Sequence, residues 1–115
     1  MSEETGQLTH VIDAYLAALV RRRIRPEAVY LFGSRARGEA GPYSDIDLIV
    51  VSQAFADMPI WRRWEVIGDA ISDVMYPIEV LAYSPEEFDS KKDRPASFLG
   101  HILRQPETIA IKPRL

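Results

Sequence analysis

The feature that most constrains this chain is an apolar segment that opens with two acids. Asp45 and Asp47 are separated by one residue, and the segment continues as an apolar run to Val51. A run that is apolar on both faces predicts a strand in the middle of a sheet, here over Asp45–Val51. Residues two apart in a strand project from the same face, with Cα atoms roughly 6 to 7 Å apart. Carboxylates held this close repel each other, and a divalent cation with oxygen ligands, most often Mg²⁺, is the usual compensation.

A glycine–serine turn precedes the acids, at the end of another predicted strand, Ala28–Phe32. Gly33 allows the backbone to approach a ligand closely, and Ser34 offers a hydroxyl and an amide. The residues that follow can open a short helix whose free amides attract anions, and Arg35 and Arg37 add positive charge. Phosphate donors beside a metal-binding acid pair form the combination that phosphoryl or nucleotidyl transfer requires.

The pattern along the chain predicts how these two motifs meet. A short loop, Glu39 to Ser44 with Gly41-Pro42, separates the turn from the acids, so the two strands should run antiparallel. A helix over 58–75 then leads to a third strand, Ile78–Tyr83, which should lie parallel to the second. Further elements are a helix over 7–23, a helix start at Ser84, a helix over Ala96–Arg104 and an extended piece over Thr108–Ile111.

Two tryptophans lie in the predicted helix over 58–75. Trp61 and Trp64 are three residues apart and continue into Ile67 and Ile71, a spacing that favours packing in the core. The alternative is an exposed surface that contacts a partner, because two arginines separate the tryptophans in the sequence, as in some nucleic-acid-binding sites.

Composition limits the function classes. With 115 residues, residues 1–115 are expected to form a single domain. Hydrophobic residues make up 47% and charged residues 27%, a balance typical of globular proteins. The net charge of −3 argues against nucleic acid as the main partner. The absence of cysteine excludes disulfides, and the lack of a signal pattern or a membrane-length apolar run predicts a cytoplasmic protein without membrane contact.

Together, the glycine–serine turn, Ala36-Arg37-Gly38 and Ser44-Asp45-Ile46-Asp47-Leu48 resemble the signature of the DNA polymerase beta-like nucleotidyltransferase superfamily, in particular its minimal members, the MNT proteins. The resemblance covers nearly the whole chain. It implies a mixed α+β fold with a palm-like core, in which helices flank a mixed β-sheet.

The resemblance also implies a two-metal site. Asp45 and Asp47 would bind Mg²⁺ together with a third carboxylate on a neighbouring strand. Glu79 is the only acid of the third predicted strand and is therefore the candidate, although the family commonly has aspartate there. Gly33, Ser34, Arg35 and Arg37 would bind the phosphates of a nucleoside triphosphate, which we expect to be ATP.

The activity implied is transfer of a nucleotidyl group, AMP from ATP, to a hydroxyl acceptor. Minimal members are often encoded beside a HEPN-domain protein, so a HEPN toxin is the expected acceptor and this protein its antitoxin, as a protein adenylyltransferase. The alternative is a weak or inactive binding module that neutralises its HEPN partner by forming a complex. Transfer to an antibiotic or to RNA is a third possibility, and either a homo-oligomer or a hetero-oligomer is compatible with the sequence.

Overall fold

A four-stranded mixed sheet organises the molecule. The computed structural model describes residues 3–39 and 45–113, and its sheet has the strand order β3-β2-β1-β4. β1 runs antiparallel to β2 and to β4, whereas β2 and β3 are parallel, so both predicted orientations are confirmed. The elements are α1 (Glu3–Arg21), β1 (Ala28–Phe32), α2 (Ser34–Arg37), β2 (Ile46–Val51), η1 (Gln53–Phe55), α3 (Ile60–Val74), β3 (Ile78–Tyr83), α4 (Pro85–Lys92), α5 (Phe98–Arg104) and β4 (Ile109–Ile111).

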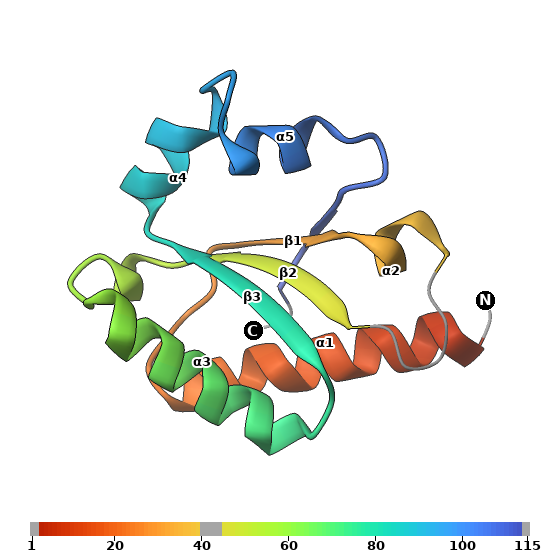
Figure 1. Ribbon diagram of the computed structural model, residues 1–115. Helices are drawn as coiled ribbons and strands as arrows, with labels where there is room; N and C mark the ends of the chain where they lie inside the picture. The colour runs from red at the N-terminus through yellow and green to blue at the C-terminus, as the bar shows by residue number, and fades with distance from the viewer. Residues whose placement is uncertain (1–2, 40–44, 114–115) are drawn as a thin grey trace.

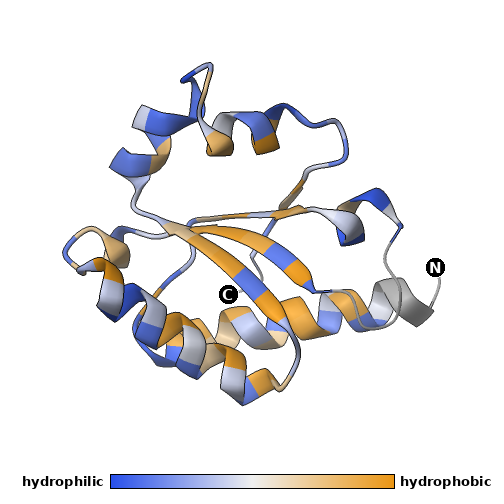
Figure 2. Cartoon of the chain, viewed as in Figure 1, coloured by the Kyte–Doolittle hydropathy of each residue, from blue (hydrophilic) through white to orange (hydrophobic). Residues whose placement is uncertain are grey.

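Helices cover both faces of the sheet (Figure 1). α1 and α3 pack on one face, where Tyr15 and Leu16 of α1 and Val66 of α3 meet Leu48 and Val50 of β2. α4 and α5 cover part of the opposite face through a smaller core cluster that comprises Ile49, Val51, Phe88, Leu99 and Ile102. β2 therefore buries apolar side chains on both faces, which is the reason for its mostly hydrophobic sequence, and Figure 2 shows the strand as hydrophobic over most of its length.

Local signals fix the ends of several elements. Ser84 caps α4 in a capping box, in which its hydroxyl accepts a hydrogen bond from the Glu87 amide and the Glu87 carboxylate accepts one from the Ser84 amide. Met75 ends α3 in the left-handed conformation with φ of 53°, and Pro77 prevents the helix from continuing. Neither end requires contacts from distant parts of the chain.

The predicted and observed boundaries differ at a few places. The first helix begins at Glu3 rather than residue 7, and β2 begins at Ile46, so Asp45 lies just before the strand rather than in it. The short η1 helix was not expected from the sequence. The predicted loop features Gly41-Pro42 and Ser44 lie outside the described residues. None of the helices within residues 3–39 and 45–113 is both long and apolar enough to cross a bilayer.

Candidate nucleotide site

The turn after β1 brings the backbone of Gly33 against the side chain of Asp47. Gly33 has φ of 78° and ψ of −157°, a conformation that residues with a side chain rarely adopt. A Cβ atom on Gly33 would lie 2.2 Å from Oδ2 of Asp47, so no side chain fits between them. The two motifs that were expected to share one volume are in contact at this point.

Pairing within the sheet places a second carboxyl beside the first. Asp47 of β2 lies opposite Phe32 of β1 on one side and opposite Glu79 of β3 on the other. Residues paired across adjacent strands project from the same face of a sheet. Phe32, Asp47 and Glu79 therefore form a row on the face that α4 and α5 partly cover.

The carboxyl of Asp47 is the group most affected by this arrangement. Burial raises its pKa to about 6, and a hydrogen bond with the Glu79 carboxyl and the negative charges of Glu79 and Asp45 add to the increase. The positive charge of Arg37 acts in the opposite direction. The side chains of Asp47 and Glu79 are therefore within hydrogen-bonding reach of each other.

Asp45 is placed differently from Asp47, whereas Glu79 is exposed as Asp45 is. Asp45 lies one residue before β2 and is exposed, whereas Asp47 is half-buried. The prediction that both acids project from one strand is thus wrong in detail, because strand pairing starts only at Ile46. The negative charge of Asp45 still reaches Asp47, as the effect on the Asp47 pKa shows.

The two arginines of α2 have different surroundings. The Arg35 guanidinium donates a hydrogen bond to the Tyr76 hydroxyl and lies over the Tyr76 ring, with Cζ 5.8 Å from the ring centroid. Arg37 is exposed, and its Nε donates to Oε2 of Glu39 at 3.1 Å. Of the two, Arg37 is the arginine whose charge acts on Asp47. Tyr76 was not identified from the sequence, where nothing links it to a residue 41 positions away.

The three carboxyl groups of the site are suited to binding a hard cation. Asp45, Asp47 and Glu79 offer oxygen donors of the kind that Mg²⁺ prefers. Within the described residues, no group of three or more acids or histidines is already arranged to hold a metal ion. Metal binding at these residues therefore requires adjustment of their side chains.

The remaining predicted site residue is Ser34. It is the first residue of α2, is half-buried, and follows Gly33, which has no side chain to cap the helix. The carbonyl oxygens of Gly33 and Ser34 accept hydrogen bonds from the amides of Arg37 and Glu39, both at 3.1 Å, so the turn is closed on itself.

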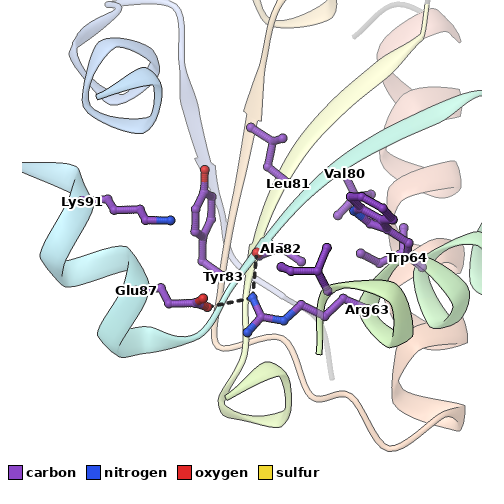
Figure 3. A pocket seen from close by; sticks show the side chains of 10 residues that line it. Arg63, Trp64, Val80, Leu81, Ala82, Tyr83, Glu87 and Lys91 are labelled. Atoms are coloured by element: carbon purple, nitrogen blue, oxygen red, sulfur yellow. Dashed lines mark hydrogen bonds and ion pairs between the residues drawn. The ribbon is translucent and has the colours of Figure 1, made fainter. Parts of the chain in front are cut away.

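The tryptophan prediction is wrong. Trp61 and Trp64 are 64% and 70% exposed, because the buried face of α3 instead follows Arg63, Val66 and Ile67. Arg63 is buried, and its Nη1 lies 2.8 Å from Oε1 of Glu87, as Figure 3 shows. The sequence analysis made no prediction for Arg63, because its burial depends on Glu87, which lies far along the chain.

Comparison with solved structures agrees with this architecture. A proposed nucleotidyltransferase from Sulfolobus solfataricus has a TM-score of 0.61 and 21% sequence identity, over 91% of this chain and 79% of that one. At this identity the likeness shows the fold, which is that of a nucleotidyltransferase.

Two further solved structures are more distant. A toxin-antitoxin crystallised with AMP-PNP is 28% identical over 61% of this chain and 56% of that one, with a TM-score of 0.46. The BolA domain of SufE1 from Arabidopsis thaliana is 18% identical over 63% and 90% of the two chains, with a TM-score of 0.44. No significant match was found among curated proteins.

The family follows from the sequence match. Residues 14–99, well over half of the chain, match the family described as nucleotidyltransferase domain. This protein therefore belongs to the nucleotidyltransferase domain family, and the role that its fold and family support is nucleotidyl transfer.

Proposed function

We propose that this protein is a metal-dependent nucleotidyltransferase that moves AMP from ATP to a hydroxyl group of a partner protein. The observation that carries the proposal is the contact of the Gly33 turn with Asp47, whose carboxyl is hydrogen-bonded to Glu79. Family membership supports the reaction class. The partner proposed is a HEPN-domain toxin, which would make this protein the antitoxin, and that part rests on the resemblance of the two motifs to minimal nucleotidyltransferases.

Each site residue has a role in this proposal. Asp45, Asp47 and Glu79 would bind two Mg²⁺ ions, which when bound supply positive charge for the triphosphate and lower the pKa of the acceptor hydroxyl. Ser34 and the amides of the turn would hold the terminal phosphates, together with Arg37. Gly33 keeps the turn close enough to Asp47 for phosphate and carboxylates to share the site.

In the proposed enzyme, Arg35 has a positioning role. Its contacts with Tyr76 hold α2 against the segment that enters β3. The acceptor oxygen would attack the α-phosphorus in line with the leaving pyrophosphate, a geometry that requires the turn and the carboxyl row to keep a fixed separation.

Labelled ATP tests the reaction directly. The protein is incubated with ATP labelled at the α-phosphate, Mg²⁺ and the HEPN-domain protein, and the label on that protein is measured. Asp47→Asn should reduce the labelling rate by at least about a thousandfold, because it removes a metal-binding charge. Asp69→Asn, on the exposed side of α3, is the matched control and should label at the wild-type rate. Undiminished labelling by Asp47→Asn would contradict the assignment.

A second candidate function is supported by one observation. Asp47 is hydrogen-bonded to Glu79, and Glu79 is one methylene longer than the aspartate common in the family. A binding module that neutralises its HEPN partner by contact alone is compatible with this pair. Such a module would leave the partner unlabelled. The wild-type protein and the Asp47→Asn variant would neutralise the partner equally well.

A further inference from the structure

The outer edge of β3 carries backbone groups that point away from the sheet. The Ile46 amide donates to the carbonyl oxygen of Pro77 at 3.0 Å, so Pro77 and every second residue after it along β3 direct their backbone groups toward β2. Because these groups alternate in direction along a strand, Ile78, Val80 and Ala82 direct their amides and carbonyls outward. β3 is the end strand of the described sheet.

Side chains close the second half of this edge. Nη1 of Arg63 lies 3.5 Å from the Ala82 carbonyl oxygen, and Oε1 of Glu87 holds the same guanidinium at 2.8 Å (Figure 3). In the part of the chain that the structure describes, no hydrogen bond closes the edge at Ile78 or Val80. The first half of the edge, residues 78–80, is therefore open to another strand.

The carboxyl row ends at this open half. Phe32, Asp47 and Glu79 lie side by side across β1, β2 and β3, and Glu79 is the last of them. Glu79 is exposed whereas Asp47 is half-buried, so the row reaches solvent at the β3 edge. Residues paired across adjacent strands project from the same face of a sheet. A strand added at this edge would therefore contribute the next side chain of the row.

A hollow of about 200 Å³ lies beside Val80, between α3, β3 and α4 (Figure 3). Its lining includes Ile60, Trp64 and Ile67 of α3, and Trp64 is 70% exposed. Val80 packs against the core cluster under α1 and α3, so it projects from the sheet face opposite to Glu79. An apolar cavity of about 150 Å³ holds a molecule as large as benzene, so the hollow can accept one apolar side chain.

We propose that the acceptor segment of the partner protein pairs with residues 78–80 as an additional antiparallel strand. The partner is the acceptor of the transfer reaction proposed above, on which this assignment of the edge rests. Ile78 and Val80 exchange backbone hydrogen bonds with the residues directly opposite them, and no outward group of Ala82 is needed. Main-chain hydrogen bonds of this kind provide affinity when a sheet edge binds an extended peptide, and the alternate side chains provide specificity.

The register determines which residue of the partner reaches the carboxyl row. The residue opposite Glu79 forms a non-hydrogen-bonded pair with it, in which the Cα atoms are about 4.5 Å apart and the side chains lie close together. A hydroxyl group on that side chain would lie beside the carboxylates. In an antiparallel strand the preceding residue lies opposite Val80 and projects toward the hollow beside Trp64.

The edge therefore fits an extended segment in which an apolar residue directly precedes a serine, threonine or tyrosine. A second copy of this chain does not meet the requirement at β3, because the same register would set Glu79 opposite Glu79. Like charges directly opposite each other destabilise strand pairing.

The reaction at this position forms one bond and breaks one. The hydroxyl oxygen of the partner bonds to the α-phosphorus of ATP. The bond from that phosphorus to the bridging oxygen breaks, its electron pair leaves with pyrophosphate, and the hydroxyl proton passes to water. Strand pairing supplies the fixed orientation that an in-line attack requires, because the acceptor side chain is held by backbone hydrogen bonds on both sides of it.

Labelling kinetics test the edge as the acceptor site. The protein is incubated with Mg²⁺, ATP labelled at the α-phosphate and increasing HEPN-domain protein, and the KM for that protein is measured. Val80→Pro removes an outward amide at a position where an edge strand tolerates proline, and Trp64→Glu places a charge at the hollow. Each variant should raise this KM by at least about tenfold and leave ATP binding unchanged. Mass spectrometry should find the label on a hydroxyl residue directly after an apolar one.

Phe98→Glu is the matched control, because Phe98 is 63% exposed on α5, away from the β3 edge. It should label the partner with the wild-type KM. Circular dichroism establishes that each variant is folded, and if Val80→Pro is unfolded, Trp64→Glu decides the question. A wild-type KM in both edge variants overturns the proposal. So does a KM raised equally in Phe98→Glu, or a label on a residue that does not follow an apolar one.

Hydrogen exchange separates the pairing from the reaction. In the absence of ATP, a saturating concentration of the HEPN-domain protein should slow exchange of the Ile78 and Val80 amides by at least about tenfold, as measured by NMR. Unprotected amides overturn the pairing even if the wild type labels its partner. Protected amides without any label on the partner overturn the transfer reaction instead, and with it the acceptor role of the paired segment.

Discussion

At the scale of single residues, two separate features of the structure require glycine at position 33. Its positive φ disfavours any side chain, and a Cβ atom would collide with Asp47. We expect Gly33→Ala to lower the free energy of unfolding by at least about 2 kcal/mol. Gly38 also has a positive φ, 75°, but a Cβ there would meet open space, so Gly38→Ala should lower it by only about 1 kcal/mol. Urea unfolding of the two variants measures the difference, and equal losses would show that the contact with Asp47 is unimportant.

Asp47 is expected to make the metal-free fold less stable as the pH rises. Its pKa in the folded state is raised to about 6, so between pH 4 and 6 the unfolded chain loses this proton before the folded chain does. The stability contributed by the protonated carboxyl is complete below pH 4 and is lost as the pH passes through 6. Asp47→Asn should therefore stabilise the protein more at pH 7.5 than at pH 4.5.

Chemical unfolding in the presence of a chelator measures this effect. Asp69→Asn gives the baseline for removing one negative charge from the same molecule. A stabilisation by Asp47→Asn that is the same at both pH values would mean that the carboxyl row does not hold a proton in the folded state.

At the scale of elements, the contact between Arg35 and Tyr76 joins α2 to the entry of β3. Tyr76→Phe removes the hydroxyl acceptor but keeps the ring, whereas Tyr76→Leu removes both contacts. We expect the amides of Arg37 and Glu39, which close α2, to exchange at least about tenfold faster in Tyr76→Leu, with Tyr76→Phe intermediate. Hydrogen exchange followed by NMR measures these exchange rates in the wild type and in both variants. Unchanged exchange in both variants would show that α2 is held by other contacts.

The sequence predicted elements best where the decisive signals are local. β1 and β3 have the predicted bounds, because short apolar runs are limited by Gly33 on one side and Pro77 on the other. The prediction of antiparallel and parallel neighbours followed from connection length and is confirmed. That register also put Glu79 beside Asp47, where the sequence expected it, although its role remains a prediction.

Prediction failed where two distant segments decide the outcome. The apolar residues of α3 extend beyond the stripe that faces the core, so periodicity could not separate the buried Val66 from the exposed Trp61. The burial of Arg63 depends on Glu87, which lies 24 positions further along the chain. Long-range pairs of this kind leave no signal in a single sequence.

At the scale of the whole molecule, the two faces of the sheet are covered unequally. α1 and α3 bury an extended cluster, whereas α4 and α5 rest on the sheet through Phe88, Leu99 and Ile102. We expect α4 and α5 to open locally at a lower free energy than β2, with amide exchange at least about tenfold faster. Hydrogen exchange by mass spectrometry resolves these segments. Equal protection in both would mean that the molecule opens only by global unfolding.

The close pairing of β1 and β2 also has a consequence for the order in which the site is assembled. The contact between Gly33 and Asp47 lies within one hairpin, so it needs nothing that follows β2 in the chain. Contacts that are near in sequence form early, and folding during synthesis proceeds from the N-terminus. On the ribosome, the Gly33 turn and Asp47 can therefore meet before β3 emerges, and Glu79 joins them only afterwards.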